Sequence, residues 1–595
     1  QITNWLSLRA QVSTDITDVK QTLKYESEQP NSLYDPNGSF QSINRRYDIV
    51  YGDVMLNFNY NINRFDIAAT VGWTGRYENM NNIRVSTNGG LVTENWFDLN
   101  ASRYTPSSTL QRMELLKTGY MGTLSLGWDN YLFLELTGRQ ERSSTLKDQS
   151  FFYPSANLSF LFTQAFHMPS WWNYGKLRLS YGIVGNAPET YTANIVYEQG
   201  SDNGFTWNTI PSSWGNADIR PEKKYEYEIG LESKFLNNRL GIDISYYNNR
   251  VKDQILSTPQ PSTSGVKNVL MNVGEVANHG WDISISATPI LTRDFRWDLT
   301  ANYGVYKNKV VKLADGVPYL EILNSGGSGI KIQAVEGQPM GDIYAQVPQV
   351  NENGEYLVSD KGLYLNQTEL QKVGNINPAG VGGLFNSFSY KNVFLDFSID
   401  FRIGGDVINE MNQYATAVGL TPESLKYRDT EHGGLSYYYP GDNNSSGIPV
   451  QVDPSTGAGP NGEIIYHDGI ILPGVVASTG ERNTRIIPAG YYYNTTYNWG
   501  TEAEQLTYRH SVFDNSYVKL RELTIGYQFP EKMISKLGLG RLSVSVFGRN
   551  LFYFYKALKN YDAESSVGTS WANQATVGSS TTATRSFGVS LRASF

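Results

Sequence analysis

The sequence predicts an all-β protein, a transmembrane antiparallel β-barrel with sixteen strands in this chain. Apolar and polar residues alternate with a period of two in sixteen separate runs, as expected of strands with two different faces. Short and long connections alternate between these runs, as in barrels whose periplasmic turns are short and whose extracellular loops are long. No stretch approaches the ~18 consecutive apolar residues of a transmembrane helix.

The last run shows the alternation most clearly. Phe587, Val589, Leu591 and the final Phe595 are separated by small or polar residues. A last strand that ends in Phe is the usual form for recognition by the barrel-insertion machinery, so we predict that these four residues are the C-terminal signal of the barrel. The sixteen predicted strands span about 3–14, 47–60, 64–77, 113–127, 131–142, 152–165, 174–187, 223–235, 239–250, 279–290, 294–309, 382–389, 393–405, 512–528, 540–554 and 582–595.

The long connections predict loops on one side of the membrane. If the last strand ends in the periplasm, counting back makes the first strand run outward, which places every long loop outside the cell. The short connection at 143–151 is the one exception in length. The predicted extracellular loops are about 15–46, 78–112, 188–222, 251–278, 310–381, 406–511 and 555–581.

Composition excludes several classes of function. The 595 residues include no Cys and carry a net charge of −8, which excludes disulfides and thiolate chemistry and disfavours a nucleic-acid partner. The five His residues are scattered and no catalytic constellation is present, so neither an enzyme nor a cofactor is predicted. Asp442 and Asn444 begin a run with oxygen ligands at alternate positions, a weak candidate for a cation site because the bidentate Glu of a calcium loop is missing.

Aromatic residues in the long loops are the candidates for substrate binding. Aromatic rings present large rigid faces at low entropy cost, and both sugars and peptide side chains stack on them. Packing between loops, or contact with a protein cap, is the alternative explanation. The candidates are Trp96, Trp207, Trp214, Tyr437, Tyr438, Tyr439, Tyr491, Tyr492, Tyr493 and Trp499.

Several short stretches, in order along most of the chain, carry a family resemblance. They include Tyr131–Leu136, Asn238–Tyr247, Asn272–Gly280, Tyr517–Tyr527 and Gly548–Phe552. Each stretch is weak alone, but together and in this order the chain resembles the SusC-like branch of TonB-dependent outer-membrane transporters.

The resemblance implies a plugged barrel larger than this chain. Large outer-membrane transporters have about 22 strands around a plug, whereas this sequence shows sixteen strands, no plug domain and no TonB box. We therefore expect residues 1–595 to be the C-terminal portion of such a barrel. The alternative is a complete, passive porin of sixteen strands.

The resemblance also implies partners and a transport function. It implies active import of nutrient oligomers through the outer membrane, energised by TonB and assisted by a SusD-like surface lipoprotein that acts as a lid. Oligosaccharides are the first expectation for the substrate and oligopeptides the second, and the residues do not separate them. We expect loops 310–381 and 406–511, the longest, to contact the lipoprotein, and a dimer of transporter–lipoprotein pairs is a family-level expectation.

Overall fold

Sixteen strands follow one another in chain order in the main sheet of the computed structural model, so the sixteen predicted strands are confirmed. The structure describes residues 1–27, 35, 37–147, 149–202, 205–260, 263, 265–314, 316–325, 329–441, 447–498, 507–566, 568, 570–578 and 583–594. The sixteen strands are β1 (Leu6–Tyr25), β2 (Ser39–Ile62), β3 (Phe65–Leu91), β4 (Ser102–Trp128), β5 (Leu132–Ser143), β6 (Ser150–Phe160), β7 (Trp172–Asn186), β11 (Glu222–Phe235), β12 (Leu240–Lys252), β15 (Glu275–Leu291), β16 (Phe295–Lys312), β22 (Pro378–Tyr390), β23 (Val393–Gly404), β31 (Tyr517–Gln528), β32 (Arg541–Lys556) and β33 (Ser586–Ser594).

The chain divides into two compact units. The first comprises Gln1–Ser233 and Ser245–Ala277, and the second comprises Lys234–Ile244 and Asn278–Phe595. No helix in the described residues is long and apolar enough to cross a membrane.

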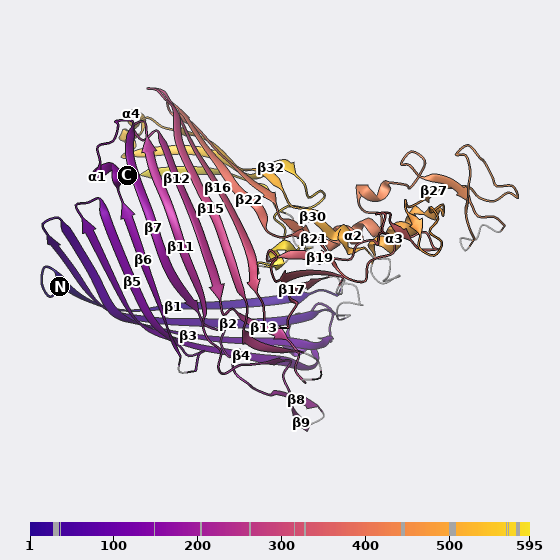
Figure 1. Ribbon diagram of the computed structural model, residues 1–595, viewed down its shortest axis with the longest axis horizontal. Helices are drawn as coiled ribbons and strands as arrows, with labels where there is room; N and C mark the ends of the chain where they lie inside the picture. Colours follow the sequence, from indigo (N-terminus) through magenta and orange to yellow (C-terminus); the bar gives the residue numbers. More distant parts are fainter. Residues whose placement is uncertain are drawn as a thin grey trace. The chain divides into compact units, whose positions relative to one another are not determined.

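In the first unit, β1 to β4 are much longer than predicted and lie side by side as long ribbons (Figure 1). The pairing of β1 with β2 continues without a break from Leu6 opposite Phe58 to Tyr25 opposite Ser39. The loops predicted at 15–46 and 78–112 are therefore wrong in extent, because most of their residues belong to strands.

The physical reason lies in what the alternation reports. A period of two appears where one face of a strand is apolar, but hydrogen bonds between strands do not require an apolar face. Stretches such as Asp15–Lys24 and Asn79–Asn82 carry polar residues on both faces. The apolar–polar alternation therefore stops there, although the backbone hydrogen bonds between the strands continue.

Smaller elements of the first unit form between its long strands. A core of Leu146, Phe151, Ala193 and Ile219 holds the segments around them, with Ile255 and Leu270 packed against it. The elements are η1 (Leu99–Ala101), α1 (Phe162–Ala165), the hairpin of β8 (Glu198–Asp202) and β9 (Phe205–Thr209), and a sheet of β10 (Ser213–Trp214), β14 (Asn268–Asn272) and β13 (Ile255–Pro259).

In the second unit, the long connections form folded structures of their own. The first, between β16 and β22, holds the four-stranded sheet β17 (Tyr319–Ser325), β18 (Ile330–Val335), β19 (Asp342–Ala345) and β21 (Gln371–Asn375), together with β20 (Leu357–Val358). The second, between β23 and β31, holds β24 (Asp406–Ile408), α2 (Glu410–Ala417), η4 (Pro422–Leu425), β25 (Leu435–Tyr438), β26 (Val450–Gln451), β27 (Tyr466–Ile470), β28 (Val475–Val476), β29 (Ile487–Pro488), α3 (Ala489–Tyr497), η5 (Tyr508–Ser511) and β30 (Val512–Asp514). The remaining short elements are α4 (Glu531–Ile534), η6 (Ser535–Leu537) and η7 (Asn573–Ala575).

One hydrophobic core joins three long loops of the second unit. Ile332 and Ile343 come from the loop after β16, Ile408 and Tyr508 from the loop after β23, and Ala575 from the loop after β32. Burial of apolar surface contributes about 25 cal/mol per Å². These loops therefore fold together as one body in place of three separate excursions.

The last strand carries its apolar residues on one exposed face. Phe587, Val589 and Leu591 are 73%, 71% and 68% exposed, and they alternate along β33 as predicted. Such a row of exposed apolar side chains is unfavourable in water and suits contact with lipid. Phe595 lies outside the described residues, so its role in the C-terminal signal stays a prediction.

Candidate functional site in the long loops of the second unit

The most elaborate loop structure lies in the described part of residues 409–511, which we call the tyrosine lobe. Its base is closed by β24 and β30, which pair antiparallel from Asp406 opposite Asp514 to Ile408 opposite Val512. The backbone N–H of Asn409 then donates to the carbonyl of Ser511 at 2.7 Å. The two ends of the lobe therefore lie side by side, as expected for a folded insertion.

Tyr437 and Tyr438 end β25, and Tyr439 follows directly after it. Successive side chains of a strand point to opposite faces, so Tyr437 and Tyr439 share the inner face and are 1% and 4% exposed, whereas Tyr438 is only half-buried. The Tyr437 ring stacks on Tyr466 at 5.5 Å and its hydroxyl donates to Asp468 at 3.1 Å. Burial, reinforced by the Asp468 carboxylate, raises the pKa of Tyr437.

Tyr491, Tyr492 and Tyr493 lie in α3 after Ala489 and Gly490, and successive residues of a helix point about 100° apart. Their side chains therefore serve different neighbours. Tyr491 and Tyr492 pack against a buried core of Leu363, Ile470, Leu472 and Ile487. Tyr493 points elsewhere: its hydroxyl donates to the carbonyl of Glu423 at 2.9 Å, and burial raises its pKa to about 12.

A pocket of about 360 Å³ brings two of these tyrosines together. Tyr439 directly follows β25 and Tyr491 lies in α3, and both line the pocket. The remaining lining residues are Lys361, Gly447, Pro449, Arg485, Ile486, Ile487 and Pro488. The size matches that of small-molecule sites, which begin at about 300 Å³.

His510 ties the end of the lobe to α3. Its ring stacks on Tyr497 with the centroids 4.5 Å apart. Burial, with a smaller contribution from the charge of Arg509, lowers the pKa of His510 to about 4. The imidazole is therefore neutral in the folded lobe at pH 7.

Acidification is expected to destabilise the lobe between pH 6.5 and pH 4. Between these pH values the imidazole of His510 is protonated in the unfolded chain but not in the folded one, so stability falls as pH falls. Below pH 4 both forms bind the proton, and stability no longer changes with pH through this group. Hydrogen exchange of the lobe across this range measures it. His510→Phe keeps the stacked ring and should flatten this part of the profile, whereas the exposed His167→Phe should leave it unchanged. An unchanged slope in His510→Phe contradicts the assignment.

Three of the four predicted tryptophans, Trp96, Trp207 and Trp214, belong to the first unit. Trp96 is 62% exposed in the turn before η1, and Trp207 is 46% exposed on β9. Trp214 is half-buried on β10, which pairs with β14. Their role as substrate platforms stays a prediction, as does that of the six tyrosines.

The predicted cation site, Asp442 with Asn444, and Trp499 lie outside the described residues. Across the part of the chain that the structure describes, no group of three or more His, Asp or Glu side chains is placed to hold a metal ion.

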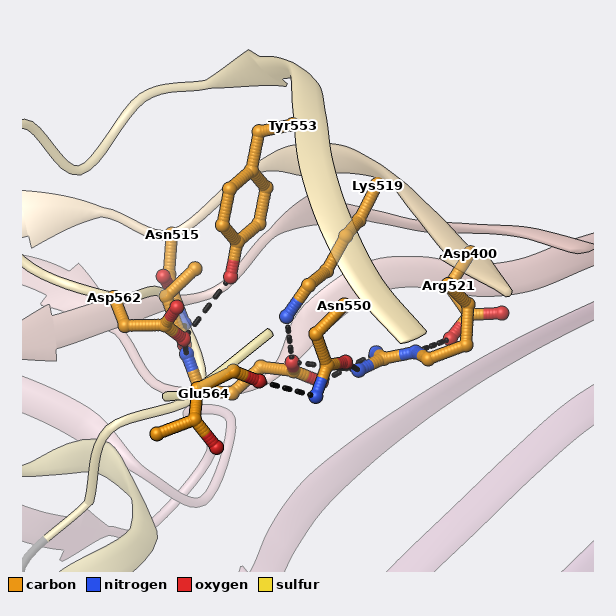
Figure 2. A network of polar contacts seen from close by, with 10 residues as sticks. Asp400, Asn515, Lys519, Arg521, Asn550, Tyr553, Asp562 and Glu564 are labelled. Carbon is orange, nitrogen blue, oxygen red and sulfur yellow. Dashed lines mark hydrogen bonds and ion pairs between the residues drawn. The ribbon is translucent and has the colours of Figure 1, made fainter. Parts of the chain in front are cut away.

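A charged network fixes the loop after β32 to the wall of the sheet (Figure 2). The Lys519 side chain is 2% exposed, and its Nζ donates to Glu564 Oε2 at 2.6 Å. Arg521 donates to the other Glu564 oxygen and to Asp400, each at 2.5 Å, and to Asn550 Oδ1 at 2.9 Å. Two cations of one strand thus hold one carboxylate of the loop.

Arg521 owes its direction to a β-bulge. In the pairing of β31 with β23, Leu520 lies opposite Ile399 and Glu522 lies opposite Ser398. No residue of β23 therefore lies opposite Arg521. An extra residue in one strand re-aims its side chain, and here it lets Lys519, Arg521 and Glu522 all make ion pairs.

Further contacts complete the attachment of this loop. The Tyr553 hydroxyl donates to Asp562 at 3.0 Å, and Asn515 Nδ2 donates to the carbonyl of Ala563 at 2.9 Å. Burial by itself raises the pKa of Glu564, but Arg521 and Lys519 outweigh it and lower the pKa to about 2. The carboxylate is therefore charged over the whole physiological range.

Sequence reasoning did not single out this network, although a signal was present. Tyr517–Gln528 alternates until Arg521 and Glu522, two charged residues in succession. A break of this kind in a period of two indicates a bulge. Glu564 carried no such signal, because its partners are more than forty residues away in the sequence.

Comparisons with known proteins agree with this architecture. A family model described as "TonB dependent receptor-like, beta-barrel" matches residues 2–328. TonB-dependent receptor P3 of Formosa agariphila is 24% identical over 494 residues, which cover 76% of this chain and 42% of the relative. TonB-dependent receptor SusC of Bacteroides thetaiotaomicron is 30% identical over 247 residues, which cover 38% of this chain and 24% of SusC.

Solved structures share the fold. The RagAB peptide importer in the "open-open" state aligns with a TM-score of 0.71 at 18% identity, covering 100% of this chain and 60% of that chain. This chain therefore spans less than half the length of the curated relatives and about three fifths of that solved chain. Because the family model covers more than half of its residues, this chain belongs to the TonB-dependent receptor β-barrel family of the bacterial outer membrane.

Proposed function

We propose that this chain is the C-terminal barrel portion of an outer-membrane importer of nutrient oligomers, energised through TonB. The observation that carries the proposal is the shared core of the three long loops. A passive channel needs only a polar lumen, whereas these loops form a folded body able to present a defined surface to a substrate or a lid protein. No catalytic role is part of the proposal.

The sheet supports the assignment to a larger barrel. Within the described strands, β1 pairs with β2 and β33 pairs with β32, and the sheet order ends at these two strands. Closure removes such edges in membrane barrels, since unpaired backbone groups are costly in lipid. Further strands and a plug, on the same or another chain, would complete a barrel of about 22 strands.

The proposed substrates are oligosaccharides first and oligopeptides second. One relative is named SusC, and the aligned structures are described as those of a peptide importer and transporter. By analogy we propose a SusD-like surface lipoprotein as partner, and a dimer of transporter–lipoprotein pairs as the assembly.

Dependence on TonB separates the importer from a passive sixteen-strand porin. Uptake of labelled oligosaccharides and oligopeptides by cells that carry the native protein should be lost when TonB is deleted. The intact mass of the membrane-extracted protein provides a second measurement. Uptake that persists without TonB, with a native chain of 66.7 kDa, would establish the porin.

The tyrosine lobe is the proposed contact of the lipoprotein, together with the loop 310–381. Because Asn409 and Ser511 are hydrogen-bonded, residues 410–510 can be replaced by a short Gly-Ser linker at the base. Co-purification of the lipoprotein should then be lost while the strands remain folded. Removal of the β8–β9 hairpin, residues 199–208, is the matched control and should preserve it. Lipoprotein retained after loss of the lobe contradicts the contact.

A further inference from the structure

We infer that the pocket of the tyrosine lobe binds one acidic sugar unit of an oligosaccharide, through the charge of Arg485. The inference rests on the proposed import of oligosaccharides and names the chemical class of the substrate. The pocket is lined by two basic residues, two tyrosines and several apolar residues.

The charged residues among the described lining residues of the pocket are both basic. Lys361 and Arg485 line it, and no Asp or Glu stands among its described lining residues. Within the described residues the Arg485 guanidinium makes no ion pair, although the chain as a whole carries a net charge of −8. A guanidinium presents a planar fork of donors that matches a carboxylate or sulfate.

The backbone of Arg485 is held in place by a buried side chain. Its backbone N–H donates to Asn483 Oδ1 at 3.0 Å, and Asn483, 3% exposed, donates in turn to the carbonyl of Leu472 at 2.8 Å. Its neighbour Ile486 is buried. The guanidinium also lies close enough to the Tyr439 hydroxyl to favour its ionised form, although burial and the nearby Asp468 carboxylate have larger effects and raise the pKa of Tyr439. A fixed backbone reduces the conformational freedom that the Arg485 side chain can lose when an anion binds.

The remaining walls favour a ring over a peptide. Tyr491 is half-buried and supplies an aromatic face, and Ile487 and Pro488 supply apolar surface. Sugar rings stack on such faces with their C–H groups, while an anionic substituent can reach Arg485. A pocket of about 360 Å³ accommodates one such unit, whereas a peptide in extended form is recognised along a strand edge through its main chain.

Calorimetry on the purified native protein tests the inference with three probes. They are an α-1,4-linked galacturonate tetramer, the same tetramer with its carboxylates methyl-esterified, and tetraglutamate. The acidic tetramer should bind about tenfold or more tightly than its ester, since hydrogen bonds to charged groups are the strong ones. Its affinity should fall as salt is raised.

Arg485→Gln should lower the affinity for the acidic tetramer about tenfold or more and leave that for the ester unchanged. Arg482→Gln, at an exposed position outside the pocket lining, is the matched control and should change neither. Equal binding of acid and ester, or equal behaviour of the two variants, overturns the inference. Tetraglutamate binding as tightly as the sugar and lost in Arg485→Gln overturns the sugar class in favour of an acidic peptide.

Two outcomes separate the pocket from the import function. If Arg485-dependent binding is found but cells take up none of the probes, the import proposal fails and the pocket stands. If cells take up the tetramers in a TonB-dependent way with no preference for the acid and no effect of Arg485→Gln, the pocket assignment fails alone.

Discussion

Tyr437→Ala is expected to destabilise the tyrosine lobe by about 3–5 kcal/mol, the range for removing a buried aromatic side chain. The ring is 1% exposed, stacks on Tyr466 and meets Tyr439 edge to face at 5.5 Å. The substitution leaves a cavity and also removes the hydrogen bond to Asp468. Native-state hydrogen exchange of β25 and β27 in detergent micelles measures the loss.

Tyr438→Ala is the matched control for Tyr437. The same residue type lies one position along the strand on the opposite, half-buried face, so its replacement should cost about 1 kcal/mol or less. The pair also tests the role predicted from the sequence. Unchanged exchange in Tyr437→Ala with loss of ligand binding would show that this tyrosine serves the substrate and not the lobe's core.

Glu564→Gln is expected to release the loop after β32 and to cost about 2–4 kcal/mol. Removing one partner of a fully buried ion pair costs about 3–5 kcal/mol, and Glu564 keeps 34% of its side chain exposed, so the loss falls toward the lower end. The variant leaves the Lys519 ammonium buried without its carboxylate. Limited proteolysis and hydrogen exchange of residues 557–566 measure the release.

The pH dependence gives an independent check on Glu564. A carboxyl whose pKa is lowered from 4.5 to about 2 stabilises the fold above pH 4.5. That contribution declines as pH falls toward 2. The wild type should therefore lose protection of this loop on acidification, and Glu564→Gln should lack this component. Glu352→Gln, at an exposed loop position, should behave as the wild type. A Glu564→Gln loop as protected as the wild type at pH 7 contradicts the attachment.

Alternation along the sequence determined the sixteen strands and their order. Strands such as Val393–Gly404 and Arg541–Lys556 agree with the prediction to within a few residues, because the period of two follows directly from one polar and one apolar face. The first four strands were predicted too short. Asp15–Lys24, for example, carries polar residues on both faces, and only its pairing with β2 shows that it is a strand.

The organisation of the candidate site was decided by tertiary structure alone. The sequence placed two tyrosine triplets in one long loop, but not which rings would be buried or which would meet. Tyr439 and Tyr491 line one pocket because the fold brings together two segments that are about fifty residues apart in the sequence. The sequence did not indicate a role for Arg485 or Glu564, because the role of a single charged residue in a loop depends on residues far away in the sequence. Local periodicity therefore fixed the wall of the barrel, while contacts between remote segments fixed the loops that would meet a substrate.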